Sequence, residues 1–305
     1  MSGASLIAPL LLLSLLVPSC RKSAGNEDPS REDSAALDAR VAKLQERLAQ
    51  ADSGGKGSDE PVARWLLGAE LTEISGLALT PDGRLFAHGD EAARVFEIDY
   101  RRGAVVKQFW VGEDALREDF EGITFAGNRF FLITSKGVLY EFAEGADGER
   151  VEFQLHDTKL GKECEFEGVA FDSTANTLLM PCKTVGEKSL QGNLVIYRYT
   201  LGSDSAGTST SELTIPMAQA VGNNGWKQLR PTDIAVDPWT GNYVMVAAQE
   251  KAILQIPPAG AVVFSRPLIG SHPQAEGIAI TRDSILIVGD EGAGQAGAIT
   301  LYRWR

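Results

Sequence analysis

Hydrophobic positions recur along this chain at regular intervals. A short apolar run follows a polar or acidic residue, with a glycine between them in four of five copies, at residues 73–79, 119–125, 165–171, 230–236 and 274–280. Aligned on the glycine position, the copies lie at 76, 122, 168, 233 and 277, so the intervals are 46, 46, 65 and 44 residues. A repeat of about 40–50 residues is typical of a propeller or another repeat array.

Each copy is followed by two more apolar runs. The second runs are nearly continuous, and the third runs alternate polar with apolar residues. They lie at 85–87, 130–133, 178–180, 243–246 and 285–288, and at 95–98, 138–142, 194–199, 253–256 and 299–302. Such runs between Gly, Pro, Asn and Asp turns are β-strands, with the inner strands covered on both faces. The pattern predicts an all-β, five-bladed β-propeller over residues 62–305.

The last copy ends after its third strand, at Trp304 and Arg305. A closed ring needs a fourth strand there. Residues 62–67 precede the first repeat and have strand character. We therefore expect this N-terminal strand to pair with the C-terminal blade and close the ring, which removes an open sheet edge.

The N-terminus predicts an exported protein. Residues 6–17 are apolar but too few to span a bilayer, which favours a signal peptide over residues 1–19. The run ends in Leu16-Val17-Pro18-Ser19-Cys20, which resembles a bacterial lipobox. Lipid on Cys20 would anchor the chain to a membrane of the bacterial cell envelope, facing the periplasm or the exterior. Plain secretion and an incidental apolar N-terminus are the alternatives.

Residues 20–61 are charged, rich in Ser and Gly and poor in large apolar side chains, so a disordered tether is expected. Within it, residues 34–51 predict a short amphipathic helix, because Leu37, Val41, Leu44 and Leu48 follow a helical spacing. The stripe is shorter than a firm coiled coil requires. A solvated or surface-docked helix is favoured over an oligomerising stalk.

Acidic residues recur at one end of the predicted inner strands. First strands line the axis, so Glu121, Glu167 and Glu276 should converge at its mouth together with Asp233. Further carboxylates fall next to these positions or at the ends of second strands, which lie on the same face of the disc. These pocket candidates are Glu73, Asp90, Glu91, Glu250, Asp290 and Glu291.

Clustered carboxylates repel one another and raise one another's pKa values, so a cation should neutralise them. Ca²⁺ suits an irregular set of about six to eight oxygen ligands, whereas zinc is disfavoured because the three histidines lie far apart in the repeats. The formal net charge of −12 agrees with a divalent cation as partner and argues against nucleic acid. The alternative is structural: each Glu-Gly is a turn whose carboxylate caps backbone N–H groups.

Two cysteines remain beside Cys20. Cys164 begins the first strand of the third repeat and Cys182 ends the second strand. Antiparallel pairing brings those ends together, which permits a disulfide in an oxidising compartment. Two free buried thiols are the alternative.

The repeats resemble the SdiA-regulated (YjiK-type) proteins over residues 65–305. The motifs that carry the resemblance are 73–78 with 89–91, 119–123, 231–237, and 275–279 with 288–291. The resemblance implies a five-bladed β-propeller in the bacterial envelope with a calcium site. Gly89 and Gly289 depart from it, since Ser is expected before each Asp-Glu pair.

A weaker resemblance, to gluconolactonase and paraoxonase-type propellers, implies a Ca²⁺-dependent hydrolase of esters, lactones or phosphoesters. His272 is then a weak candidate for the base, and a solvated loop histidine is the alternative. The sequence has no Gly-x-Ser-x-Gly motif and no phosphate-binding loop. The function that the sequence favours is that of a calcium-binding or calcium-homeostasis module. The hydrolase, and a scaffold for an unknown small molecule or envelope protein, are the alternatives.

Overall fold

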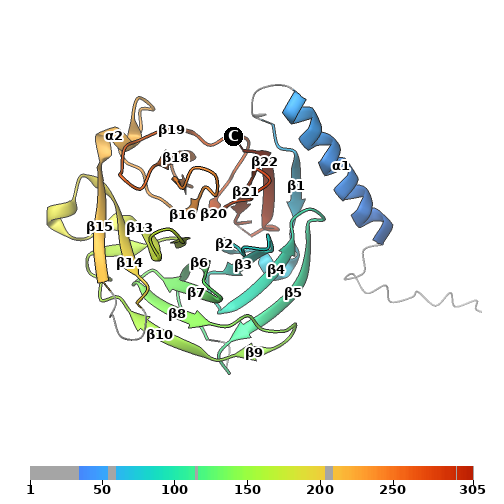
Figure 1. Ribbon diagram of the computed structural model, residues 1–305, viewed down its shortest axis with the longest axis horizontal. Helices are drawn as coiled ribbons and strands as arrows, with labels where there is room; N and C mark the ends of the chain where they lie inside the picture. The colour runs from blue at the N-terminus through green and yellow to red at the C-terminus, as the bar shows by residue number, and fades with distance from the viewer. Residues whose placement is uncertain (1–33, 54–59, 114–115, 203–208, 293, 305) are drawn as a thin grey trace, which may run out of the picture.

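The computed structural model describes residues 34–53, 60–113, 116–202, 209–292 and 294–304. In these residues the strands form five sheets, which Figure 1 shows arranged around a central axis. The sheets follow one another in chain order around the ring. The protein is therefore a five-bladed β-propeller, which confirms the fold predicted from the repeats.

Blades one and two are built from consecutive antiparallel strands, and one short strand from the loop of blade two pairs in parallel with the outer edge of blade one. Their strands are β2 (Ile74–Leu79), β3 (Leu85–Gly89), β4 (Arg94–Asp99), β5 (Ala104–Val111) and β9 (Arg150–Val151) in blade one, and β6 (Phe120–Ala126), β7 (Arg129–Thr134), β8 (Val138–Phe142) and β10 (Phe153–Asp157) in blade two.

Blades three to five follow the same plan, and in blade three the inner strand is split into two short pieces. The strands are β11 (Cys164–Phe166), β12 (Ala170–Asp172), β13 (Thr177–Val185), β14 (Asn193–Thr200) and β15 (Ser209–Pro216); β16 (Asp233–Val236), β17 (Tyr243–Ala247), β18 (Ala252–Ile256) and β19 (Phe264–Pro267); and β20 (Ala275–Ile280), β21 (Ile285–Asp290), β22 (Ala298–Arg303) and β1 (Ala63–Leu66). Short helices lie at Ala69–Leu71, Lys188–Leu190 and Met217–Val221 (α2).

The N-terminal strand closes the ring as predicted. β1 pairs antiparallel with β22, so that Ala63 lies opposite Leu301 and Leu66 opposite Ala298. The backbone N–H of Leu67 extends the pairing by donating to the carbonyl of Gly297 at 2.8 Å. The seam satisfies the outer edge of β22, which would otherwise be left open to solvent.

Burial follows the hydrophobic pattern from the axis outward. All six residues of β21 and all five of β17 and β18 are buried, whereas the outer strand β15 is mostly exposed. Apolar side chains of neighbouring blades interlock, as where Phe86 of blade one meets Phe130 of blade two edge to face at 4.7 Å. The core is therefore a ring of inter-blade clusters around the axis.

The N-terminal helix α1 (Ser34–Ser53) lies along the outside of the ring beside β1, as Figure 1 shows. Leu44 is only 2% exposed and packs into the cluster shared by blades one and five, with Leu48 and Ala51 against it. Asp38 also forms an ion pair with Arg102, and Asp52 forms one with Arg303. The amphipathic stripe thus produces a surface-docked helix, one of the two forms favoured from its spacing.

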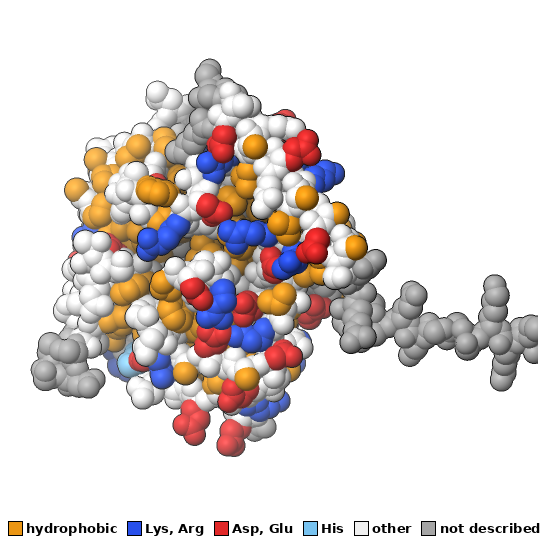
Figure 2. Space-filling view, turned by 45° about the vertical axis from the view of Figure 1, so that its right-hand side comes forward, with side chains coloured by type: hydrophobic (Ala, Val, Ile, Leu, Met, Phe, Trp, Pro, Cys, Tyr) orange, Lys and Arg blue, Asp and Glu red, His pale blue; other side chains and the backbone are white. Residues whose placement is uncertain are grey.

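Charged side chains of both signs are interspersed over the face seen in Figure 2, with hydrophobic atoms between them. None of the helices among the described residues is both long and apolar enough to cross a membrane. The predicted signal peptide, Cys20 and the Gly/Ser stretch at 54–59 lie outside the described residues. Lipidation of Cys20 therefore stays a prediction.

Candidate functional site

The inner strands approach so closely at the axis that most blades have no room for a side chain at the repeated glycine. A Cβ on Gly122 would lie 2.6 Å from the Cα of Gly168. A Cβ on Gly168 would lie 2.6 Å from the Cα of Asp233, and Gly168 also has a φ of +89°. Its N–H donates to the carbonyl of Glu121 at 2.6 Å, which joins blades two and three. The glycine of the repeat is therefore required by backbone packing.

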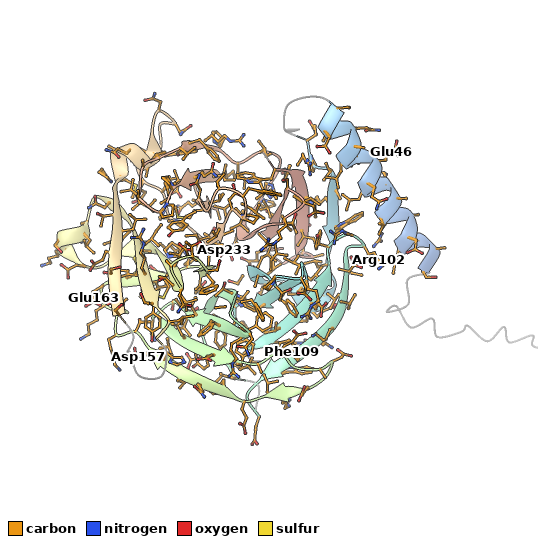
Figure 3. All side chains as sticks on the ribbon, in the orientation of Figure 1. Glu46, Arg102, Phe109, Asp157, Glu163 and Asp233 are labelled. Carbon is orange, nitrogen blue, oxygen red and sulfur yellow. A yellow bond between two sulfur atoms is a disulfide. The ribbon has the colours of Figure 1, made fainter. Side chains whose placement is uncertain are left out.

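Asp233 takes the glycine position in blade four, and its side chain lies in the axis near the centre of Figure 3. The carboxylate is fully buried and accepts 2.8 Å hydrogen bonds from the N–H groups of Ile234 and Ile278, and another from Leu77. Burial raises its pKa, and these amide donors act in the opposite direction. The sequence places Asp233 among the cation ligands, but the structure uses its oxygens to join blades four, five and one.

The residues immediately before this layer lie around the axis. Glu121, Glu167 and Glu276 are contributed by blades two, three and five. The charges of Glu167 and Glu276 raise the pKa of Glu121, and the charge of Glu167 also raises the pKa of Glu276. Blade four contributes Thr232, whose hydroxyl donates to the carbonyl of Ala275 at 2.6 Å. We call this group, with the carboxylates next to it, the acidic mouth.

Glu121 is the most perturbed group of the acidic mouth. Burial, followed by the charges of Glu167 and Asp119, raises its pKa to about 9. The carboxyl is therefore protonated near neutral pH. A group in this state releases a proton when a cation takes its place.

A second part of the acidic mouth is contributed by blade five. Burial, then the charges of Glu276, Asp90 and Glu73, raises the pKa of Glu291 to about 7. The side-chain amide of Gln274 donates to Glu276 at 2.8 Å and also to Glu291. The amide thus links the carboxylates of Glu276 and Glu291 through hydrogen bonds to both.

Blade one supplies the remaining pocket residues predicted for the mouth. The pKa of Glu73 is raised, chiefly by the charge of Asp90 and then by burial and Glu91. The pKa of Asp90 is raised by burial, with the charges of Glu91 and Asp119 adding to it. These charge effects indicate that the carboxylates of blade one lie near one another and near Asp119 of blade two.

One cation already lies in the acidic mouth. Lys183, on β13, forms an ion pair with Glu167, and burial still leaves the pKa of Glu167 raised. Cys182, the residue before Lys183, forms a disulfide with Cys164, and the Cα atoms of the two cysteines are 5.4 Å apart. It ties β11 to the part of β13 that carries Lys183.

Two predicted pocket carboxylates are committed to other partners. Glu250 binds the guanidinium and the backbone N–H of Arg230, at 3.0 and 3.1 Å. Asp290 is 1% exposed and receives a 2.8 Å hydrogen bond from Nδ1 of His272. These carboxylates stabilise the blades from within, which the spacing of acidic residues alone does not reveal.

His272 is buried rather than solvated in its loop. Its Nδ1 faces Asp290 and its Nε2 faces the hydroxyl of Tyr302, both at 2.8 Å. The side chain is 1% exposed. With both nitrogens engaged inside blade five, the arrangement offers no open position at which the imidazole could take a proton from a substrate.

Sequence reasoning missed Lys183 and Gln274. Lys183 follows Cys182 near the end of a second strand, the place where the acidic candidates were sought, and a search there for either sign of charge would have found it. Gln274 occupies the first position of the fifth repeat copy, where two other copies begin with Glu. Its neutral amide gave no signal of chemistry.

The donors of the mouth are oxygens, which suits a hard cation such as Ca²⁺. Among the residues that the structure describes, however, no group of three or more His, Cys, Asp or Glu side chains is placed to hold a metal ion. The carboxylate of Glu167 is paired with Lys183, and the carboxylate of Asp233 accepts hydrogen bonds from backbone N–H groups. The mouth therefore has the charge of a cation site without a preformed coordination shell.

Comparison with solved structures shows the fold. The chain is similar to the PQQ-bound aldose sugar dehydrogenase of Streptomyces coelicolor, with a TM-score of 0.53 and 14% identity over 81% of this chain and 98% of that chain. It is also similar to a glutaminyl cyclase of Myxococcus xanthus, with a TM-score of 0.52 and 13% identity over 80% and 95%. At such identities the likeness establishes a β-propeller and nothing finer.

A gluconolactonase of Xanthomonas campestris is more distant, with a TM-score of 0.45 and 12% identity over 75% of this chain and 72% of that one, and carries no argument. No protein-family model and no curated protein matches the sequence. The resemblance to SdiA-regulated proteins thus stays a prediction.

Proposed function

We propose that this chain is a bacterial envelope lipoprotein, anchored through Cys20, whose acidic mouth binds Ca²⁺ without turnover. It would act as a binding or calcium-homeostasis module. The observation that carries the proposal is the raised pKa of several carboxyls around the axis, through burial and neighbouring negative charge, above all that of Glu121 to about 9. Such a cluster is strained by its own charge and gains free energy when positive charge enters it.

Binding has to compete with what neutralises the mouth already. A proton on Glu121 and the ammonium of Lys183 on Glu167 both have to give way to an ion. The proposal therefore predicts affinity that rises with pH, as the proton becomes easier to displace. It also predicts Ca²⁺ over Mg²⁺, because Mg²⁺ requires a near-ideal octahedron that the mouth does not hold ready.

Thermal unfolding tests the proposal in the wild-type protein and in Glu121→Gln. At pH 8, Ca²⁺ should raise the melting temperature of the wild type and EGTA should reverse the rise. Ion at about 100 times its Kd stabilises the fold by about 2.7 kcal/mol. Glu121→Gln should lose most of this response. Glu212→Gln, on the exposed outer strand β15, is the matched control and should respond as the wild type does.

Glu121→Gln should also melt higher than the wild type at pH 8 without Ca²⁺. The unfolded carboxyl ionises above its usual pKa of 4.5, but in the fold it keeps its proton up to about 9, so the wild type loses stability as pH rises between these values. Gln has no such loss, and the gain is on the order of 1–3 kcal/mol. Absence of a Ca²⁺ response in the wild type, or an equal response in Glu121→Gln, would refute the cation site.

A further inference from the structure

Blade four carries two connections at one end of its strands. Residues 237–242 join β16 to β17, and residues 257–263 join β18 to β19. Val236 pairs with Tyr243, and Tyr243 pairs with Ile256, so both connections lie at the same end of the blade. The acidic mouth lies at the beginning of the inner strands, which places these connections at the opposite end of the disc. We call residues 237–242 and 257–263 the blade-four tip.

The exposed side chains of the blade-four tip are apolar apart from Thr240. Trp239 is 68% and Val263 56% exposed, two of the five exposed large hydrophobic side chains among the described residues. Residues 257–263 read Pro-Pro-Ala-Gly-Ala-Val-Val and carry no charge, and the one charged residue of 237–242, Asp237, is buried. Of the five tryptophans, all of which the structure describes, Trp239 alone is exposed. An uncharged apolar surface of this kind is typical of an interaction site.

The shape of the blade-four tip is fixed by hydrogen bonds. Asp237 accepts the backbone N–H of Trp239 at 3.0 Å and the indole N–H of Trp304 at 3.3 Å. Arg198 of blade three donates to the carbonyl of Pro258 in the second connection. Trp239 is therefore presented on a preformed turn, and little backbone freedom is lost when its side chain enters another environment.

Two exposed arginines flank the blade-four tip. Arg266 follows the second connection on β19, and Arg282, in a turn of blade five, lines the same cavity as Pro238 of the first connection. Neither forms an ion pair with a residue that the structure describes. Positive charge beside an apolar, Trp-bearing surface suits a partner that is apolar inside and anionic outside.

The aspartates of that cavity do not neutralise these arginines at the surface. Asp172 and Asp237 are 6% and 4% exposed and accept hydrogen bonds from neutral donors around them. The two exposed ones, Asp82 and Asp283, are each paired with another arginine, at 2.9 and 3.0 Å. The acidic mouth lies at the far end of the inner strands, about 20 Å away at 3.3 Å per residue. Charges at this distance are largely screened, because the Debye length is about 8 Å at physiological ionic strength.

We propose that the blade-four tip docks on the surface of a lipid bilayer that contains anionic phospholipids. Trp239 and Val263 enter the headgroup region, where Trp is favoured, and Arg266 and Arg282 face lipid phosphates. The inference rests on the proposed anchor at Cys20 for proximity alone. α1 begins 14 residues after Cys20, and a chain of this length reaches at most about 50 Å. Docking in this way turns the acidic mouth away from the bilayer.

Quenching of tryptophan fluorescence by brominated phospholipid tests the proposal on the full chain, with EDTA present. The vesicles contain phosphatidylglycerol and phosphatidylcholine, with or without bromine on the acyl chains. Residues 1–64 contain no tryptophan, so insertion of the N-terminus alone gives no signal. The wild type should be quenched by brominated vesicles. Trp239→Phe should not be, because the four other tryptophans stay outside the bilayer.

A matched pair of variants locates the docking surface. Val263→Asp keeps all five tryptophans and should abolish the quenching, because it places a charge in the apolar surface. Leu155→Asp makes the same change at a side chain that is 57% exposed on β10 of blade two, and should be quenched as the wild type is. Arg282→Gln should need about fivefold more lipid on anionic vesicles and be unchanged on pure phosphatidylcholine. Circular dichroism checks the folding of each variant.

Cys20→Ser separates docking from the anchor, because it cannot be lipidated. It should reach the same quenching of Trp239 at about a hundredfold higher lipid concentration. Equal lipid demand in the wild type and Cys20→Ser would refute the anchor and leave the docking surface in place. Sedimentation of the wild type with vesicles without quenching would overturn the docking and leave the blade-four tip to a protein partner. Quenching that persists in Trp239→Phe, or is lost equally in Leu155→Asp, would overturn it as well, and a wild type that neither sediments nor is quenched would refute both.

Discussion

At the residue scale, single positions near the axis decide what the propeller can hold. The repeated glycine permits inner strands to meet backbone to backbone, and the one exception, Asp233, replaces missing contacts by accepting N–H groups from three blades. One position earlier, the same geometry places the carboxylates of three blades around the axis, where burial and neighbouring negative charge raise the pKa of Glu121. Within the motif, the glycine position thus serves backbone packing, and the position before it supplies the acidic group.

The sequence predicted the ring of Glu121, Glu167 and Glu276 because their register follows from the repeat. It could not predict which acidic residues would be neutralised inside the blades. Asp290 is taken by His272 and Glu250 by Arg230, and these pairings depend on loops that cross the blade and leave no period in the sequence. Periodicity fixes backbone position, whereas side-chain partners are decided by tertiary packing.

His88 provides a residue-scale prediction for acid stability. It is fully buried beside Gly76, and burial lowers its pKa from 6.5 to about 4, against the opposite effect of backbone hydrogen bonds to Gly89 and Ser75. The unfolded histidine protonates below pH 6.5 while the folded one stays neutral until about 4, so acidification costs stability across this window. The full loss is about 3 kcal/mol.

Urea unfolding at pH 7 and pH 4.5 checks this in the wild type and His88→Leu. The carboxyl groups titrate in both proteins, so the difference between them isolates the histidine. The stability of the wild type relative to His88→Leu should fall by about 2–3 kcal/mol between the two pH values. A difference that stays constant would show that His88 is not kept neutral by burial.

At the element scale, blade three is the most irregular. Its inner strand is split into β11 and β12, the register shifts between Glu165 and Phe166, and the disulfide joins β11 to β13 on the side of the acidic mouth. The repeat predicted a continuous first strand here. The split lies where Glu167 reaches Lys183, so local irregularity coincides with the ion pair that the repeat did not predict.

Reduction of the disulfide should destabilise the fold through blade three. Cys164 and Cys182 are 18 residues apart, and closing a loop of this length stabilises a fold by about 3 kcal/mol. Urea unfolding with and without dithiothreitol should show a loss of this size in the wild type. The double variant Cys164→Ala/Cys182→Ala should have the lower free energy of unfolding from the start, and dithiothreitol should not change it. Equal stability of the reduced and oxidised wild type would contradict this prediction.

At the scale of the whole molecule, the ring is closed by chain ends that are about 240 residues apart in sequence. The repeats predicted this closure, because a third strand at the C-terminus left one place for residues 62–67. They could not predict where the helix would lie. α1 docks beside the seam through Leu44 and through its ion pairs to Arg102 and Arg303.

Leu44→Asp should undock α1 and leave the propeller folded. A charge at a position 2% exposed cannot be accommodated against the apolar cluster of blades one and five. Hydrogen exchange should show loss of protection in residues 34–53, with protection retained in the inner strands β17 and β21. Glu46→Asp, an exposed position of the same helix, is the control. Unfolding of the whole chain by Leu44→Asp would instead make α1 part of the closure itself.

The central claim, that the acidic mouth takes up a cation, is tested most directly by calorimetric titration of Ca²⁺ at pH 8 in two buffers that differ in ionisation enthalpy. The account predicts saturable binding with release of roughly one proton, chiefly from Glu121, and a smaller release in Glu121→Gln. Above pH 9 the release should diminish, because the carboxyl is then ionised beforehand. Ca²⁺ binding without proton release, or no binding at all, would contradict the account.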